Sequence, residues 1–212
     1  MARTFLNINY DRKAYNTIPY FIKEKTGIRI PDVITILDVF LYLFRKELLE
    51  NKKIIIRNFG KLYLINYKRK GKIVFFKSYI KLKDIVNNIS PNEFDVQRVS
   101  KGISIILKKT AKCFGIKYEE AKYIFNLFIY GIVKELLKFK VMKLRKFGIF
   151  EIYEMKFNKT NVCGIERDIE RVNRVLFRGK PELLRVLNGQ EDKLDVLKRS
   201  KRLLKLHNFI EK

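Results

Sequence analysis

The stretch RNFGKLYLINY, residues 57–67, has a second version in RKFGIFEIYEM, residues 145–155. Each version places Arg-x-Phe-Gly before an alternating run with many apolar residues, the pattern of a strand with one buried face. Gly60 and Gly148 lie 88 positions apart, and the same offset aligns the KELL of residues 46–49 with the KELL of 134–137 without a gap. We therefore expect two copies of one unit, each of about 90 residues.

Helical spacing of apolar residues predicts the first two elements of each copy. In the first copy a helix over 14–26 ends at Gly27, and Pro31 begins a second helix that runs to about Asn51. In the second copy the corresponding helices span 102–114, which ends at Gly115, and 118–139. Glycine suits the left-handed position that ends a helix, and proline suits a first turn.

The remaining elements of each copy are short. Runs rich in β-forming residues over 52–69 and 140–157 bend at their Phe-Gly, and short helices over 79–88 and 181–188 close the copies. The expected order in each copy is α-α-β-β-β-α, which is an α+β fold.

Both long helices are apolar around nearly their whole circumference, so each needs to be buried on all sides. A unit with three short strands cannot bury such a helix alone, and the helix must pack against the other copy or against a partner subunit. We interpret six side chains as assembly faces of these helices: Phe40, Leu43, Phe44, Phe125, Phe128 and Ile132.

Composition changes mark the expected domain boundaries. The first unit takes residues 1–90, a linker 91–99, and the second unit 100–188, with the Asn-, Ser- and Pro-rich stretch 87–94 at the junction. Residues 189–212 combine leucines at helical spacing with many Lys and Arg, which predicts a basic amphipathic helix outside the repeat.

The chain of 212 residues carries 47 Lys and Arg against 22 Asp and Glu, a formal net charge of +25. Such a protein attracts polyanions, and nucleic acid is the usual one because bound phosphates release counterions. An anionic membrane surface, an acidic protein partner, or a soluble protein that is merely rich in Lys would also account for the charge.

Several function classes have no support in the sequence. Two cysteines far apart and one histidine do not form a zinc site, and no Gly-rich phosphate loop or nucleophile–base pair is present. We expect no catalysis, no metal, no cofactor and no small-molecule substrate. The longest apolar segment, VITILDVFLYLF, is too short to span a membrane, and the N-terminal residues have no signal-peptide core, so we expect neither secretion nor membrane insertion.

The repeated unit resembles the bacterial HU/IHF family of DNA-bending proteins. The residues that carry the resemblance are NFGKL (58–62) and KFGIF (146–150), with a looser match in FFKSYIKLKDIV (75–86) and LFRGKPELLRVL (176–187). The resemblance implies two helices, a three-stranded sheet with a long β-arm, a closing helix, and an intertwined dimer. The two copies would then pair with each other, or each would pair with a copy on another chain.

The arms depart from the family pattern. Gly60 to Phe76 spans 16 positions and Gly148 to Phe177 spans 29, so the first arm is cut to a short hairpin with a turn at Lys70-Gly71. The resemblance implies an Asn-Pro wedge at the arm tip, a device that kinks duplex DNA. In the second arm Asn161 matches the asparagine, but Val162 stands where the proline would be. This arm also contains Glu166, Asp168 and Glu170, which oppose phosphate binding.

Two hypotheses follow. The favoured one is a structural protein that uses the fold for protein–protein assembly near packaged DNA, because the tandem form with altered arms resembles the IHF-like virion proteins of crAss-like tailed phages. Its expected partners are virion proteins or copies of itself in a homo-oligomeric ring, in the virion or the host cytoplasm. The alternative is an architectural protein that binds and bends double-stranded DNA. Ten residues are candidate polyanion contacts: Lys68, Arg69, Lys70, Lys72, Lys143, Arg145, Lys146, Arg167, Arg171 and Arg174.

Overall fold

The first copy of the repeat folds as two helices, three strands and a closing helix. The computed structural model of the chain describes residues 17–68, 71–88, 99–156 and 171–189. In order along the first copy, the elements are α1 (Thr17–Thr26), α2 (Ile30–Asn51), β1 (Lys53–Ile56), β2 (Gly60–Tyr67), β3 (Gly71–Ser78) and α3 (Ile80–Val86).

The second copy repeats this order. Its elements are α4 (Lys101–Phe114), α5 (Tyr118–Phe139), β4 (Val141–Leu144), β5 (Gly148–Lys156), β6 (Arg171–Gly179) and α6 (Pro181–Leu187). The described residues thus form six helices and two antiparallel sheets, β1-β2-β3 and β4-β5-β6. The mixed α and β class predicted from the sequence is confirmed. The predicted arm tip, Asn161 and Val162, and the predicted C-terminal helix lie outside the described residues.

The strand registers confirm how the two copies correspond beyond the first strands. Leu62 pairs with Phe76 in the first sheet, and Phe150 pairs with Phe177 in the second. Leu62 and Phe150 are 88 positions apart, whereas Phe76 and Phe177 are 101 apart. The difference is the 13 residues by which the connection between the last two strands is longer in the second copy.

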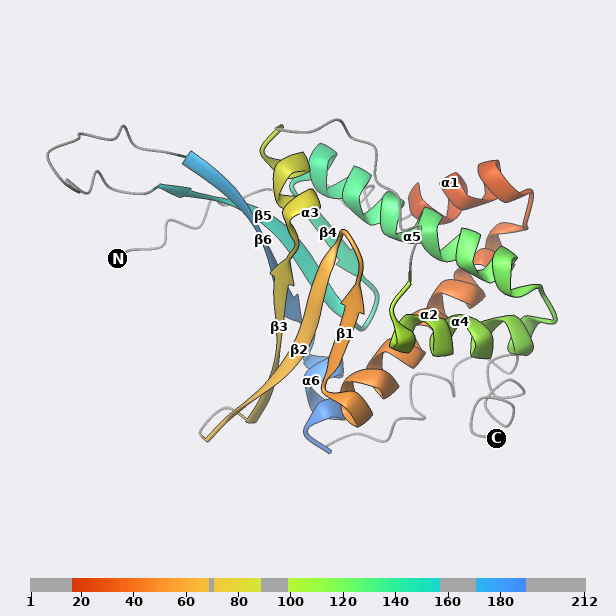
Figure 1. The fold of residues 1–212 in the computed structure, drawn as a ribbon, viewed down its shortest axis with the longest axis horizontal. Helices are drawn as coiled ribbons and strands as arrows, with labels where there is room; N and C mark the ends of the chain where they lie inside the picture. Colours follow the sequence, from red (N-terminus) through yellow and green to blue (C-terminus); the bar gives the residue numbers. More distant parts are fainter. Residues whose placement is uncertain (1–16, 69–70, 89–98, 157–170, 190–212) are drawn as a thin grey trace, which may run out of the picture.

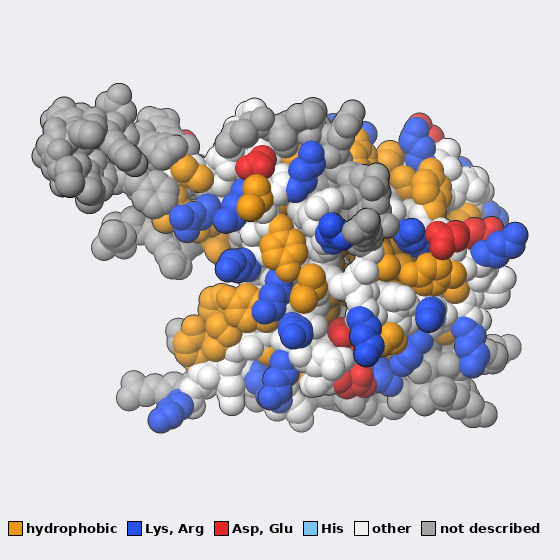
Figure 2. All heavy atoms as spheres, viewed as in Figure 1, with side chains coloured by type: hydrophobic (Ala, Val, Ile, Leu, Met, Phe, Trp, Pro, Cys, Tyr) orange, Lys and Arg blue, Asp and Glu red, His pale blue; other side chains and the backbone are white. Residues whose placement is uncertain are grey.

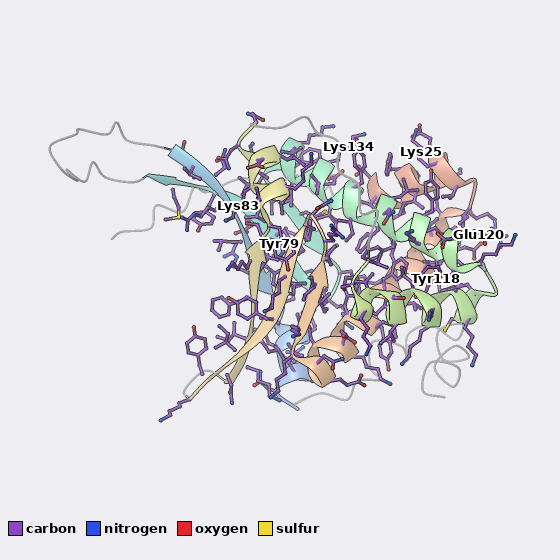
Figure 3. The ribbon with its side chains drawn as sticks, viewed as in Figure 1. Lys25, Tyr79, Lys83, Tyr118, Glu120 and Lys134 are labelled. Carbon is purple, nitrogen blue, oxygen red and sulfur yellow. The ribbon has the colours of Figure 1, made fainter. Side chains whose placement is uncertain are left out.

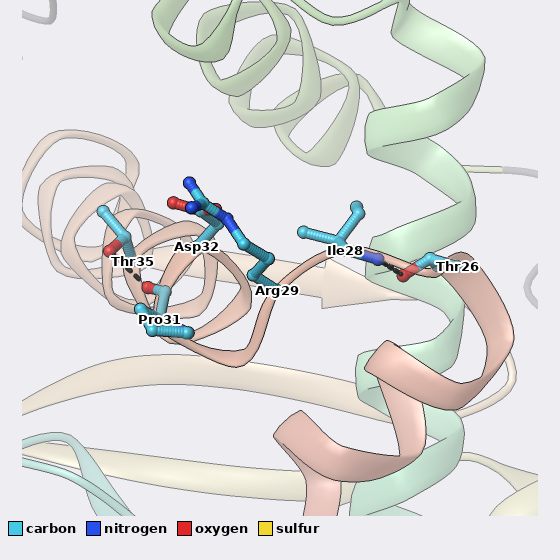
Figure 4. Close-up of polar contacts among 6 residues, drawn as sticks. All are labelled: Thr26, Ile28, Arg29, Pro31, Asp32 and Thr35. Atoms are coloured by element: carbon cyan, nitrogen blue, oxygen red, sulfur yellow. Dashed lines mark hydrogen bonds and ion pairs between the residues drawn. The ribbon is translucent and has the colours of Figure 1, made fainter.

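The helix ends follow the predicted chemistry. Gly27 and Gly115 adopt left-handed φ angles of 72° and 64° just after α1 and α4. Between α1 and α2, the Thr26 hydroxyl accepts a hydrogen bond of 3.2 Å from the Ile28 amide (Figure 4). The same hydroxyl donates a hydrogen bond of 2.7 Å to the Ile22 carbonyl. Arg29 Nε lies 3.0 Å from Asp32 Oδ2 in the first turn of α2, and Thr35 donates to the Pro31 carbonyl. These contacts stabilise the end of α1 and the first turns of α2.

The two copies exchange contacts reciprocally. Helix α1 of the first copy packs on α5 of the second, and α4 packs on α2. In the same way α3 contacts β6, α6 contacts β3, and the edge strands β3 and β6 lie next to each other. Figure 1 shows the four longer helices gathered on one side of the two sheets. One continuous apolar core therefore joins the two copies within a single chain.

The repeated KELL sequence takes part in this exchange. Glu135 of α5 is buried, and its Oε1 accepts a hydrogen bond from the Thr17 hydroxyl at the start of α1. The corresponding Glu47 of α2 reaches α4, where a Cβ on Gly102 would lie 2.6 Å from its Oε1. In each copy, the glutamate of the KELL sequence therefore lies against the first helix of the other copy.

Phenylalanines fill the centre of the shared core. The ring of Phe40 lies 5.6 Å from that of Phe125, and Phe44 lies 6.2 Å from Phe125 and 6.0 Å from Phe147, between ring centroids. All six residues interpreted from the sequence as assembly faces are buried here: Phe40, Leu43, Phe44, Phe125, Phe128 and Ile132. They join the two halves of one chain, so they are not exposed for contact with another copy.

Two details differ from the sequence predictions. The second helix was expected to be buried on all sides, but its apolar Ile34 is 40% exposed, so α2 is not buried all round near its start. Asn87, which lies in both the closing helix predicted over 79–88 and the junction stretch 87–94, forms the C-terminal cap of α3 and also bonds to a strand of the other copy, which the sequence did not predict. In the sequence, a polar residue at the end of a helix resembles a linker residue, because its hydrogen-bond partner lies far away along the chain.

Candidate functional site

The outer faces of the two sheets are the surfaces best suited to binding. Side chains alternate along each strand, so Leu62, Val74, Phe150 and Phe177 point into the core and their neighbours point away from it. We define hairpin 1 as β2–β3 (residues 60–78) and hairpin 2 as β5–β6 (residues 148–179). Figure 2 shows hydrophobic side chains over β2 and β3 on the side away from the helices, with Lys and Arg beside them.

The outer face of hairpin 1 is aromatic and aliphatic in the middle. The strand register places Tyr63 opposite Phe75 and Ile65 opposite Ile73, with Tyr67 opposite Gly71. The ring centroids of Tyr63 and Phe75 are 6.1 Å apart with their planes 29° from parallel, and Tyr67 lies 6.2 Å from Phe75. Tyr67 is 43% exposed and the other four side chains are half-buried. The rings form a row across the hairpin.

Basic residues stand around this row of rings. Lys61 and Lys77 lie opposite each other in the strand register at one end of hairpin 1. Lys61 Nζ lies 5.2 Å from the centroid of the Tyr63 ring. Lys68 and Lys72 are exposed at the other end. Residues 60–78 contain six Lys or Arg and no Asp or Glu. Positive potential from this hairpin is therefore not cancelled by carboxylates in the same segment.

The outer face of hairpin 2 has a different character. Its apolar members are Ile149, Tyr153, Met155, Val172 and Leu176, the last 41% exposed. An ion pair joins Arg178 Nη2 to Glu151 Oε1 across the strands, and the Tyr153 hydroxyl lies 3.4 Å from Met155 Sδ. Residues 148–179 contain six Lys or Arg and five Asp or Glu. The two hairpins correspond in position but not in charge.

Two asparagines, one just after each closing helix, form hydrogen bonds to the last strand of the hairpin in the other copy. The side chain of Asn87, after α3, accepts a hydrogen bond of 2.7 Å from the Asn173 amide and donates one of 3.0 Å to the Asn173 carbonyl. Asn188, after α6, makes the matching pair with the amide and carbonyl of Lys72, at 2.8 and 3.2 Å. No pattern in the sequence predicted a role for either asparagine. The available signal was their separation of 101 positions, the same as between Phe76 and Phe177.

A buried cation lies behind one of the two Phe-Gly turns. Arg45 of α2 is 4% exposed, and its Nη2 donates to the Lys146 carbonyl at 2.9 Å. Burial lowers the pKa of Arg45 to about 10, while Asp38 and Glu182 oppose this change. Burial also raises the pKa of the Asp38 carboxyl, against the charges of Arg145, Arg45 and Lys146. The position that corresponds to Arg45 in the second copy is Val133, so this cross-contact exists on one side only.

The structure does not gather the predicted polyanion contacts into one cluster. Lys68 and Lys72 lie at the end of hairpin 1, Arg145 is exposed at the β4–β5 turn, and Arg174 is exposed on hairpin 2. Lys143 and Lys146 are half-buried, and Arg171 begins β6. Arg69, Lys70 and Arg167 lie outside the described residues.

Positive charge is also found far from the hairpins. Figure 3 shows Lys83 beside the sheets on α3, whereas Lys25 and Lys134 lie on the helices α1 and α5. Lys134 Nζ lies over the ring of Phe21, 5.3 Å from its centroid. Because cations cover several elements, total charge does not single out a binding face, and the local absence of carboxylates in hairpin 1 is the more specific signal.

Other kinds of site are not found in the described ranges. Residues 17–68, 71–88, 99–156 and 171–189 contain no group of three or more His, Cys, Asp or Glu placed to hold a metal ion. Cys113 is a half-buried free thiol whose pKa is raised by burial. Among the helices in these same ranges, none has the length and apolar character needed to cross a membrane.

Comparisons of the chain with models of protein families, with curated proteins and with solved structures found no match.

Proposed function

We propose that this chain is a non-enzymatic structural protein in which two HU/IHF-like units pair within one chain. The support for the fold is the repeated order of elements, together with the reciprocal packing of α1 on α5 and α4 on α2. The resemblance further supports a setting in a phage particle, as part of a portal or tail ring close to packaged DNA.

The observation that carries the structural role is the outer face of hairpin 2. It exposes apolar side chains such as Leu176, and its Glu151 and Arg178 neutralise each other in an ion pair. Copies of a protein with a net charge of +25 repel one another. Arg174 is a further exposed cation on hairpin 2, but residues 148–179 contain six basic and five acidic residues, against six and none in residues 60–78. Copies therefore approach at lower electrostatic cost on this face than on hairpin 1, and desolvation of its apolar area favours the contact. We propose that this face binds another copy of the chain.

The test is a substitution on that face. We expect Leu176→Glu to shift the protein from oligomers or rings to a smaller species, because a buried unpaired carboxylate opposes association. Sedimentation velocity at moderate salt measures the shift, and circular dichroism checks that the variant stays folded. Ile105→Glu is the matched control: Ile105 is 41% exposed on α4, like Leu176, and a glutamate there stands four residues from Lys101 and Lys109.

Two results would count against the assembly role. One is a wild-type protein that sediments as a single chain at every concentration that can be reached. The other is an equal loss of association in Leu176→Glu and Ile105→Glu, since the contact would then have no special connection with hairpin 2.

The alternative function, binding and bending of duplex DNA, draws support from the exposed cations Lys68, Lys72, Arg145 and Arg174. These lie on both hairpins and on one Phe-Gly turn. A bend in a short duplex, together with a steep loss of affinity as salt rises, would favour this alternative over the structural role.

A further inference from the structure

Hairpin 1 combines two features that nucleic-acid-binding surfaces share. Its outer face presents the rings of Tyr63, Phe75 and Tyr67 in a row, with planes tilted by 29° and 39° between neighbours. Its ends carry Lys61 with Lys77, and Lys68 with Lys72. Proteins that bind single strands without sequence preference use aromatic rings on which bases stack, beside cations that follow the phosphates.

The charge of the segment favours a polyanion as the occupant. Residues 60–78 contain six basic and no acidic residues, whereas residues 148–179 contain six and five. The two hairpins come from equivalent positions of the same repeat, so the fold does not impose this difference. An anionic ligand approaching the molecule therefore meets the more favourable potential at hairpin 1.

The rings decide between a single strand and a duplex. In a duplex the faces of the bases are covered by their neighbours in the stack, so rings lying on a sheet reach only sugars and phosphates. In a single strand the base faces are accessible, and an exposed Tyr or Phe ring stabilises each stacked base. From Lys61 to its end at Tyr67, β2 extends over about 20 Å, at roughly 3.3 Å per residue. This length accommodates a few nucleotides.

We propose that the outer face of hairpin 1 is a stacking platform for a short stretch of single-stranded nucleic acid. The bases stack on Tyr63, Phe75 and Tyr67, and the phosphates lie toward the lysines at the two ends. The proposal does not depend on the assembly role of hairpin 2, because the two faces share none of these residues.

The test compares three fluorescent probes by anisotropy on the whole chain: a 12-nucleotide oligothymidylate, a 12-base-pair duplex, and a 12-residue peptide of alternating Glu and Leu. We expect the oligothymidylate to bind most tightly. Phe75→Leu and Tyr63→Leu keep apolar bulk but remove the ring, and each should weaken oligothymidylate binding by about 5-fold or more, the lower end of the range for one stacked base. Lys77→Gln should reduce the salt slope by about 0.7.

Controls separate stacking from a general loss of structure. Tyr123→Leu changes a tyrosine that is 49% exposed on α5, outside both hairpins, and should leave the affinity for oligothymidylate unchanged. Tyr67→Leu alters a side chain that is 43% exposed, so it tests the same platform with little risk to folding if the other variants unfold. The chain has no tryptophan, so quenching of its tyrosine emission on binding is a second readout, and Tyr67→Leu should reduce the quenching.

Three outcomes would overturn the proposal. Equal or tighter binding of the duplex, unaffected by the ring substitutions, would mean that the lysines simply hold phosphates. Tighter binding of the acidic peptide, weakened by the same substitutions, would identify a protein-docking face. Loss of oligothymidylate binding in Tyr123→Leu to the same extent as in Phe75→Leu would show that hairpin 1 is not the site.

Discussion

Phe125→Ala is expected to destabilise both halves of the chain at once, lowering the free energy of unfolding by about 3–5 kcal/mol. Phe125 belongs to α5 of the second copy, but its ring packs edge-on against Phe40 and Phe44 of α2 in the first. Its side chain is fully buried, so the alanine leaves a cavity at the contact between the copies. Because that cavity borders both halves, chemical denaturation should still show one transition, moved to lower denaturant.

The control for this prediction is on the same helix. Tyr123 of α5 is 49% exposed, and Tyr123→Ala should change the free energy of unfolding by much less. Two separate transitions in the Phe125→Ala protein, one of them at the position found for the wild type, would contradict a shared core. Equal losses for Phe125→Ala and Tyr123→Ala would contradict the burial described above.

Gly148→Ala is expected to lower the free energy of unfolding by about 1–3 kcal/mol, the usual cost of overpacking. A Cβ at this position would lie 2.1 Å from Phe177 Cζ and 2.9 Å from the Arg178 carbonyl oxygen. At the equivalent Gly60, a Cβ would lie 2.5 Å from Phe76 and 2.6 Å from the Lys77 carbonyl oxygen. The glycine of each Phe-Gly turn is therefore required by the phenylalanine of the facing strand, which explains why the two residues recur together.

A double-mutant cycle tests that explanation. Phe177→Leu shortens the side chain that the new methyl group meets, so Gly148→Ala should cost less in that background, with a coupling of about 0.5–3 kcal/mol. Gly102→Ala is the matched glycine control, since its Cβ would meet the end of the long Glu47 side chain rather than a ring or a backbone atom, and alanine favours the helix α4. A neutral Gly148→Ala, or additive effects of the two substitutions, would refute the steric account. Denaturant titration of the four proteins provides all of these values.

The repeat made much of the fold predictable. The 88-position offset was found by comparing the chain with itself. The left-handed Gly27 and Gly115, and the helices that end near Asn51 and Phe139, could be read from local patterns, because they depend on residues close in sequence. Phe59 and Phe147, the phenylalanines of the two Phe-Gly turns, are both buried.

The candidate binding faces were less accessible to sequence reasoning. The ring row of hairpin 1 exists only because the register places Tyr63 opposite Phe75, and an error of one residue would send one of these rings into the core. The hydrogen bonds of Asn87 and Asn188 join residues 86 and 116 positions apart. Pairing within one chain or between chains buries the same apolar helices, so amphipathic patterns alone do not distinguish these arrangements.

The central claim, that the two copies build one core inside a single chain, has a direct test in the mass of the smallest folded species. Sedimentation equilibrium of the Leu176→Glu protein, at low concentration and moderate salt, removes the assembly contact proposed for hairpin 2. We predict a folded species of 25.4 kDa that keeps its helical circular dichroism. A smallest folded species of twice that mass, which loses its helical signal as it dissociates, would show that the copies pair between chains and would contradict the account.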